Sequence, residues 1–273
     1  WDSIPDQGLL DAAAAGKLQT REQIAEQARR MLDDPRAREK AQRFMHYWLD
    51  IEHAHELVKS EQMFKEFDPQ LAADLRTSLD LYIEDVLWGD QPDFRRLLKS
   101  NELYVNGRMA AYYRFDLPTD APFQKVEAPD RRGAGVITHP FILSRFAYTD
   151  ATSPIHRGVF LVRSVLGRGL RPPPEAVAPL PIDVNPDLTT RQRVELQTKP
   201  QACQGCHIMI NPLGFTLEHF DAVGRFRESE SGKPIDASGR YDLASGETRD
   251  LQGAQDLADF LADNGETHRA FAM

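Results

Sequence analysis

The two cysteines of the chain and one histidine form a complete CxxCH motif, Cys203-Gln204-Gly205-Cys206-His207. Two thiols at this spacing can each form a thioether with a haem vinyl group, and the histidine that follows can bind the iron. The chain has 2 Cys in 273 residues, so the motif uses all of them. The spacing predicts one covalently attached haem c, held by Cys203 and Cys206, with His207 as its iron ligand.

Other interpretations of the motif have less support. A structural zinc site needs about four protein ligands, and the sequence offers no second Cys pair. His53 and His55 are two residues apart, so they would diverge on a helix and make a poor metal pair. A thioredoxin-like redox pair would follow a hydrophobic strand, whereas residues 197–202 are polar and Pro200 suits the first turn of a short helix. A redox pair, another metal site and coincidence remain as alternatives.

The residues just after the motif are candidates for supporting the haem. We expect His207 to bind iron through Nε2 and to donate from Nδ1 to a nearby acceptor, for which the Pro212 carbonyl is a candidate. That assignment places Pro212 just past the end of a short helix, in a turn over Asn211–Gly214. Phe215, with its neighbours Leu213 and Leu217, would cover an apolar porphyrin edge. Ordinary core packing explains these three residues equally well.

Haem propionates require basic or hydrogen-bonding partners where they are partly buried. Arg225 and Arg227 are two residues apart and would share one face of a strand, which makes them the best candidates. Solvent-facing arginines are the commoner case. Arg157, Arg163 and Arg168 are weaker alternatives.

The sixth iron ligand is left open by the sequence. Met209 lies too close to His207 on the same helix to reach the opposite haem face. A methionine would raise the redox potential, a histidine would lower it, and a vacancy would permit ligand chemistry. The candidates other than a vacancy are His139, His156, His219 and His268 in the second half of the chain, and Met31, Met45, Met63 and Met109 in the first half.

Helical patterns dominate the first half of the chain. Thr20 and Gln23 have the spacing of a capping box, which predicts a helix through about Met31. Asp34-Pro35 and Asp68-Pro69 open two further helices. Short helices are expected around 94–98 and 105–112. Prolines, glycine and charges over 116–135 predict an exposed loop.

The second half adds helices on both sides of the motif. Helices are expected from His139-Pro140, from Ser153-Pro154 (with Ile155, Val159, Val162 and Leu166 on its apolar face) and from Thr190. A proline-rich connector would run from about Arg171 to Asp187. Residues 225–249 suit a small β-hairpin, and a last helix begins near Gln252.

These elements predict a mainly α fold. The expected organisation is a helical domain over 1–115, a linker loop over 116–135, a haem c domain over 136–250, and over 251–273 the start of a further helical domain that the segment cuts short. The haem c domain would contain mostly short helices, the proline-rich connector and the hairpin.

Composition excludes several function classes. The net charge of -9 disfavours nucleic-acid binding, and the 41% hydrophobic content supports a real core. The sequence contains no run of about 18 apolar residues, so it predicts no membrane-spanning helix. Haem is attached to CxxCH motifs outside the bacterial cytoplasm, so we expect a longer exported precursor whose leader is absent from this segment. The predicted location is therefore periplasmic or extracellular.

The motif and its surroundings resemble a known family. The pattern Cys203–His207, Asn211–Phe215, Leu217–Asp221 and Gly224–Arg227 resembles the haem c domains of large secreted planctomycete proteins. Further segments resemble other parts of the same proteins. Thr152–Gly158 and residues 171–174 resemble the segment that precedes the haem c domain. Residues 1–10 and 101–113 resemble its helical partner domain, and residues from about 251 resemble the beginning of another domain.

The resemblance implies a redox role at the cell envelope, in proteins that often carry another c-type haem domain and for which polysaccharide degradation has been suggested. The function expected is one-electron transfer to a redox partner protein or to another haem domain of the same precursor. Two alternatives remain: a peroxidase-type haem enzyme with an open distal site, and an interaction or carbohydrate-binding module with a structural haem.

Overall fold

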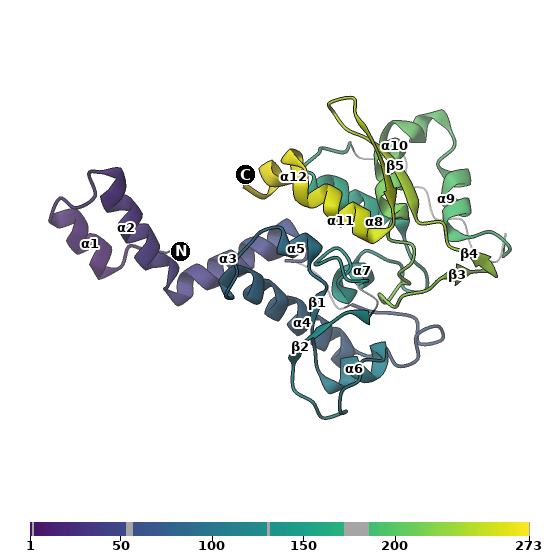
Figure 1. Ribbon diagram of the computed structural model, residues 1–273, viewed down its shortest axis with the longest axis horizontal. Helices are drawn as coiled ribbons and strands as arrows, with labels where there is room; N and C mark the ends of the chain where they lie inside the picture. Colours follow the sequence, from purple (N-terminus) through teal and green to yellow (C-terminus); the bar gives the residue numbers. More distant parts are fainter. Residues whose placement is uncertain (2, 53–56, 130–131, 172–185, 273) are drawn as a thin grey trace. The chain divides into compact units, whose positions relative to one another are not determined.

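The computed structural model describes residues 1, 3–52, 57–129, 132–171 and 186–272. The chain forms two compact units, Trp1–Glu52 and His53–Met273. About 51% of the structure is helical, and its sheets are small and two-stranded (Figure 1), which confirms a mainly α fold with small hairpins. The predicted boundaries at 115 and 135 both fall within the second unit, and the four predicted domains stay predictions. Within the described residues, no helix is both long and apolar enough to cross a membrane.

The first unit consists of three helices, α1 (Gln7–Ala14), α2 (Arg21–Leu32) and α3 (Pro35–Trp48). The predicted capping box is present, because Thr20 accepts from the Gln23 amide and the Gln23 side chain accepts from the Thr20 amide. Asp34 caps α3 and Pro35 occupies its first turn, as predicted.

The second unit begins with α4 (Pro69–Trp88), the longest helix, whose N-terminus is capped by Asp68. Helix α4 packs against the first strand of the strand pair that follows it. A short helix, α5 (Arg96–Lys99), lies between α4 and that strand in the sequence. The buried apolar side chains of α4 recur at helical spacing: Leu71, Leu75, Leu79, Tyr82, Ile83 and Val86.

Residues 116–135 were expected to form an exposed loop, and this expectation is wrong for part of the segment. Strand β2 (Gln124–Glu127) pairs antiparallel with β1 (Glu102–Val105), and Leu103 lies opposite Val126. Helix α6 (Gly107–Tyr113) lies between the two strands in sequence. The strand is short and mostly exposed, so its sequence lacks the apolar alternation that would have revealed it.

Two capped helices follow, α7 (Pro140–Arg145) and α8 (Pro154–Phe160). Helix α8 continues directly into a π-helical segment, η2 (Leu161–Val165). The expected apolar face of α8 is only partly right: Val162 and Leu166 are buried, whereas Ile155 and Val159 are half-buried. The wider π turn changes the helical spacing at residue 161, and a strict 3.6-residue pattern fails there.

The CxxCH motif lies on α10 (Gln201–Phe215), which follows α9 (Thr190–Gln197). The short helix and the turn expected at 211–214 are wrong, because α10 continues through Pro212. Tertiary packing holds this part of the helix: Gly214 lies against the Pro154 carbonyl and Gly158 against the Ile210 carbonyl, where α8 and α10 cross. Most of the predicted proline-rich connector lies outside the described residues.

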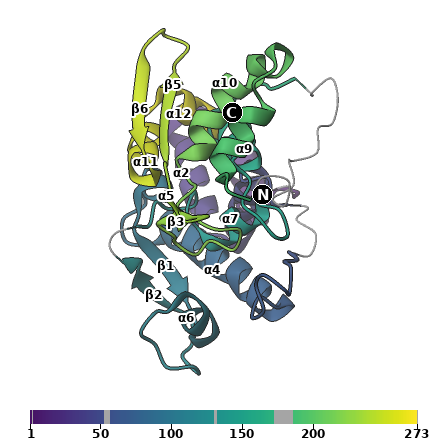
Figure 2. The same cartoon turned by 90° about the vertical axis from the view of Figure 1, so that its right-hand side faces the viewer.

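The C-terminal part contributes two hairpins and two helices (Figures 1 and 2). Where one hairpin was expected, β3 (Ser229–Glu230) pairs with β4 (Lys233–Pro234), and β5 (Ser238–Asp242) pairs with β6 (Thr248–Gln252). Strand β5 packs on α10, α11 (Ala254–Asp263) on α5, and α12 (Gly265–Ala272) on η2. The last two helices therefore belong to the packing of the second unit.

Candidate functional site

Helix α10 presents the motif on one face. Cys203, Cys206 and His207 occupy positions i, i+3 and i+4, which lie one above another along a helix. The cysteines are not joined in a disulfide, and all three side chains are partly exposed. Two thiols and one imidazole are therefore available on the same side of a single rigid element.

The ring of His207 is held by a chain of hydrogen bonds. Its Nδ1 lies 2.9 Å from the Oδ1 atom of Asn211, one turn further along α10. The Asn211 amide donates to the Thr198 hydroxyl over 2.9 Å, and that hydroxyl donates to the Val194 carbonyl over 2.8 Å. With the amide nitrogen committed to Thr198, the Asn211 oxygen faces the ring, so Nδ1 carries the hydrogen. The lone pair is then on Nε2, which forms no hydrogen bond with any described residue.

Pro212 does not supply the acceptor that the sequence predicted. It lies inside α10, and its carbonyl oxygen is packed against Gly239 of β5. Asn211 provides the acceptor instead, because the helix continues past it and places the two side chains at i and i+4. Phe215 is buried at the end of the helix with the Arg191 guanidinium 4.5 Å from its ring centre, a position consistent with core packing.

Arg225 and Arg227 flank Phe226 outside any named strand. Residues 224–227 form an irregular segment in which only Phe226 makes an isolated bridge, to Phe220. Arg225 pairs with Asp221 at 2.8 Å. Arg227 pairs with Glu218 at 3.3 Å and lies 3.5 Å from Glu230. The two side chains therefore serve different clusters, and their role toward propionates stays a prediction.

The three alternative arginines have protein partners. Arg163 is exposed and donates to the Leu170 carbonyl, and Arg168 pairs with Glu266 at 2.7 Å. Arg157 is 1% exposed, and burial lowers its pKa to about 10. Its guanidinium lies 3.8 Å from the Glu218 carboxylate, whose pKa burial raises. It donates to four main-chain carbonyls, those of Leu143, Leu217, Phe220 and Asp221.

The four histidines considered as sixth ligands lie in different environments. His139 is buried, caps α7 through Nδ1 and contacts the Ser78 hydroxyl through Nε2 at 3.1 Å. His219 contacts the Arg227 carbonyl, and His268 contacts that of Ala262. His156 is exposed and lies beside the ring of Tyr148. Both ring nitrogens of His139 are thus engaged.

The methionine candidates divide between the two units. Met31 and Met45 belong to the first unit, Met63 is 60% exposed in the second, and Met109 is fully buried there. A zinc site gains no support, because within the described residues no three His, Cys, Asp or Glu side chains come close enough to hold a metal ion.

Sequence reasoning missed Asn211 and Thr198, although Asn211 carried a usable signal. An Asn four residues after a predicted iron ligand can reach its ring, provided that the helix continues. The expected turn at Pro212 concealed this possibility. Thr198 could not be found, because its contact depends on how α9 returns to α10.

Two family models match the chain. Residues 1–115 match PSD4, described as "Protein of unknown function (DUF1592)", and residues 132–230 match PSCyt3, described as "Protein of unknown function (DUF1588)". No curated protein and no solved structure shows significant similarity to the chain. The second match contains the CxxCH motif and the Asn211 contact. Both matched families are found in planctomycete-type multihaem cytochrome c proteins.

Proposed function

We propose that this chain is a c-type cytochrome module that carries one covalently bound haem and transfers single electrons. Cys203 and Cys206 form the two thioethers, and His207 binds the iron through Nε2. The bound haem supplies a one-electron couple between ferrous and ferric iron. The chain's residues attach it and orient its ligand.

The hydrogen bond between His207 and Asn211 is the observation that carries the proposal. Histidines that bind metals usually donate their other ring N–H to a fixed acceptor, which sets the tautomer and the ring orientation. Here that acceptor is in place at 2.9 Å and is itself held by Thr198.

The surface position of the motif supports electron exchange. Gln204 and Gly205, between the two cysteines, are exposed. Large apolar side chains are exposed nearby in sequence, with Leu196 at 53% and Ile208 at 64% exposure. The proposal assigns both to the porphyrin edge, where the haem would cover them. The attached edge would then face solvent, where a partner can approach.

The proposal includes a location and a partner. Covalent haem attachment to CxxCH places the chain in the periplasm or outside the cell. The electron partner is a redox protein or another haem domain of the same precursor. The families matched here occur in multihaem proteins, which favours the second kind of partner.

Spectra of the holoprotein, recorded oxidised, reduced, and reduced under carbon monoxide, test the function. An electron carrier with two protein ligands gives low-spin spectra that carbon monoxide leaves unchanged. A high-spin ferric form that binds carbon monoxide on reduction would contradict the proposal and indicate a haem enzyme. A methionine-to-iron band in the near infrared would identify the sixth ligand as Met rather than His.

A further inference from the structure

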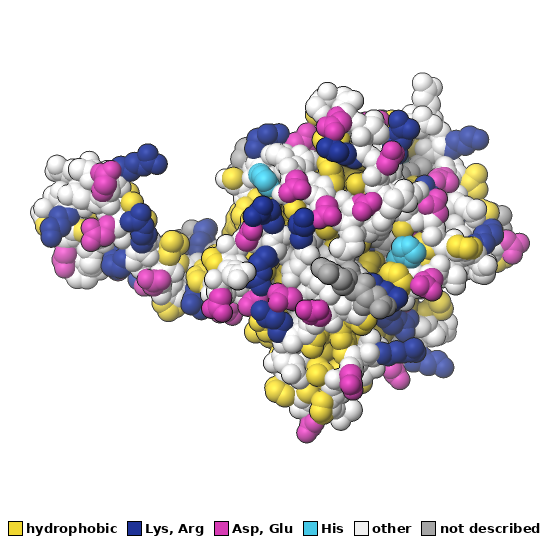
Figure 3. Space-filling view, in the orientation of Figure 1, with side chains coloured by type: hydrophobic (Ala, Val, Ile, Leu, Met, Phe, Trp, Pro, Cys, Tyr) yellow, Lys and Arg dark blue, Asp and Glu magenta, His cyan; other side chains and the backbone are white. Residues whose placement is uncertain are grey.

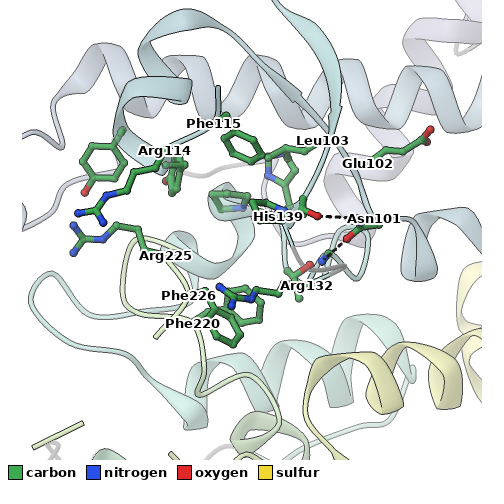
Figure 4. Close-up of a pocket in the computed structure, with 18 of the residues that line it drawn as sticks. Asn101, Glu102, Leu103, Arg114, Phe115, Arg132, His139, Phe220, Arg225 and Phe226 are labelled. Carbon is green, nitrogen blue, oxygen red and sulfur yellow. Dashed lines mark hydrogen bonds between the residues drawn. The ribbon is translucent and has the colours of Figure 1, made fainter. Parts of the chain in front are cut away.

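The second unit contains a pocket of about 670 Å³ that the haem proposal does not use. It lies between the β1–α6 segment and residues of the segments 128–129, 132–140 and 220–226 (Figure 4). Hydrophobic side chains gather over β1, β2 and α6 on the face shown in Figure 3. Both family-matched segments contribute to the lining, so neither forms the pocket alone. A volume of this size suits a small molecule.

Three guanidinium groups line this pocket in a protein of net charge -9: those of Arg114, Arg132 and Arg225. Arg132 is stacked on Phe226, 3.7 Å from the ring centre. The guanidinium groups of Arg114 and Arg225 point toward the same end of the pocket (Figure 4). That end therefore concentrates positive charge.

Three acidic side chains also line the pocket, those of Glu66, Glu102 and Asp221. Asp221 is committed to Arg225 at 2.8 Å. Glu102 is paired with Arg96 at 3.0 Å, outside the pocket. Glu66 is exposed but lies close enough to Tyr112 to contribute to the raised pKa of that hydroxyl. His139 is neutral, because burial lowers its pKa to about 3. Arg114, which is exposed, is therefore the arginine at this end of the pocket that has no ion-pair partner among the described residues.

Arg114 adopts an unusual backbone conformation. It ends α6 with φ 63° and ψ 43°, in the left-handed region that usually favours glycine at this position. Its guanidinium forms no hydrogen bond or ion pair with any described residue. A strained backbone that places an unpaired arginine at a pocket is a pattern associated with ligand sites.

Tyr112 supplies a second unused donor. Its hydroxyl is buried without a hydrogen-bond partner among the described residues. Its ring lies 5.6 Å from the Arg225 guanidinium, and burial raises its pKa to about 12, which keeps the hydroxyl protonated. Buried hydroxyl groups normally have a partner, so an orphaned one that lines a pocket points to an acceptor from a ligand.

We propose that this pocket binds an aromatic carboxylic acid. The carboxylate receives hydrogen bonds from Arg114, Arg225 and the Tyr112 hydroxyl, and the ring packs on Phe115, since both faces of Phe226 are already covered by Arg132 and His219. This end of the pocket suits a single carboxylate better than a phosphate dianion, since Asp221 already neutralises Arg225 and Glu66 adds a further negative charge. The Phe115 ring favours a ligand with a planar apolar body.

Calorimetric titration of the holoprotein with benzoate tests the proposal, with benzamide and inorganic phosphate as comparison probes. We expect saturable one-to-one benzoate binding, at least tenfold weaker binding of uncharged benzamide, and weaker binding of phosphate. Charge-assisted hydrogen bonds support a factor of this size. No saturable benzoate binding, equal affinity for benzamide, or preference for phosphate would each overturn the proposal.

Variants separate binding from folding. Arg114→Gly should weaken benzoate binding at least tenfold and also raise the melting temperature, because glycine adopts the left-handed conformation without strain. Tyr112→Phe should weaken binding about fivefold, the effect of one neutral hydrogen bond. Arg249→Gln, a change at an exposed arginine paired with Glu247, is the matched control and should bind as the parent does. Undiminished binding by Arg114→Gly would overturn the assignment.

Discussion

Asn211 Oδ1 lies 2.9 Å from His207 Nδ1, one helical turn further along α10. The contact fixes the ring through a residue of its own helix, so the orientation of the imidazole does not depend on a mobile loop. It also leaves Nε2 available on the face that carries both cysteines. Helix α10 therefore carries Cys203, Cys206 and His207 together with Asn211, the acceptor that orients the His207 ring.

Substitutions of Asn211 should change the redox potential of the holoprotein in opposite directions. Asn211→Asp makes the imidazole more basic, stabilises ferric iron and lowers the potential. Asn211→Leu removes the acceptor and raises the potential. A tenfold change in the relative affinity for the two oxidation states corresponds to about 60 mV in a one-electron couple. Potentiometric titration measures both shifts, and identical potentials in all three proteins would contradict the assigned contact.

Replacing a glycine of α10 by alanine should lower the free energy of unfolding at one position and raise it at another. Gly214→Ala places a methyl group on the Pro154 carbonyl and should lower the free energy of unfolding by about 1–3 kcal/mol. Gly205→Ala is the matched control on the same helix, since nothing lies within 4 Å of its added Cβ. It should raise stability by about 0.5–1 kcal/mol. Urea unfolding monitored by circular dichroism distinguishes the two, and equal effects would contradict the close helix crossing.

The buried Arg157 should be much more important for stability than an exposed arginine that follows it closely. Arg157→Met leaves the Glu218 carboxylate without its closest buried guanidinium and removes the donor from four carbonyls, so a loss of about 3–5 kcal/mol is expected. Arg163→Met, at an exposed site, should change stability by less than about 0.5 kcal/mol. Chemical denaturation of both variants provides the comparison. A small effect of Arg157→Met would show that the cluster relaxes or admits water.

The buried His139 should make stability decrease as the medium becomes acidic. Burial lowers its pKa to about 3 from an ordinary value of 6.5. The unfolded chain therefore takes up the proton first, and stability that is fully present above pH 6.5 is lost as the pH falls toward 3. The slope approaches about 1.4 kcal/mol per pH unit.

His139→Asn tests this linkage. Asparagine also caps helices well and does not titrate, so the variant should retain the start of α7. The free energy of unfolding of each protein is first measured at pH 8 as its reference. Between pH 6.5 and 4 it should decrease less for the variant than for the parent. Parallel pH profiles for the two proteins would contradict a neutral buried His139.

Local signals in the sequence were sufficient for several helices and for the motif. Thr20 with Gln23, Asp34-Pro35 and Asp68-Pro69 each marked a helix start that the structure confirms, because capping depends on residues three positions apart or fewer. Pro200, which suits the first turn of a helix, indicated the helix that carries Cys203 and His207. These features require no knowledge of distant contacts.

Features set by tertiary packing were not predictable in the same way. Pro212 would normally end a helix, yet α10 continues because its last turn is packed against Pro154 and Gly239. Strand β2 exists through its pairing with β1, and its own residues are mostly polar. The pocket residues Tyr112 and Arg225 are 113 positions apart in the chain, and no local pattern links them.

Covalent haem attachment is the central claim, and a denaturing gel stained for haem tests it most directly. The segment, exported in a bacterial host that matures c-type cytochromes, should retain haem after denaturation. Cys203→Ser and Cys206→Ser should each retain at most one thioether, and the double variant should retain no haem. Gly205→Ala should stain like the parent. A parent chain without bound haem, in cells that load a known c-type cytochrome, would contradict the account.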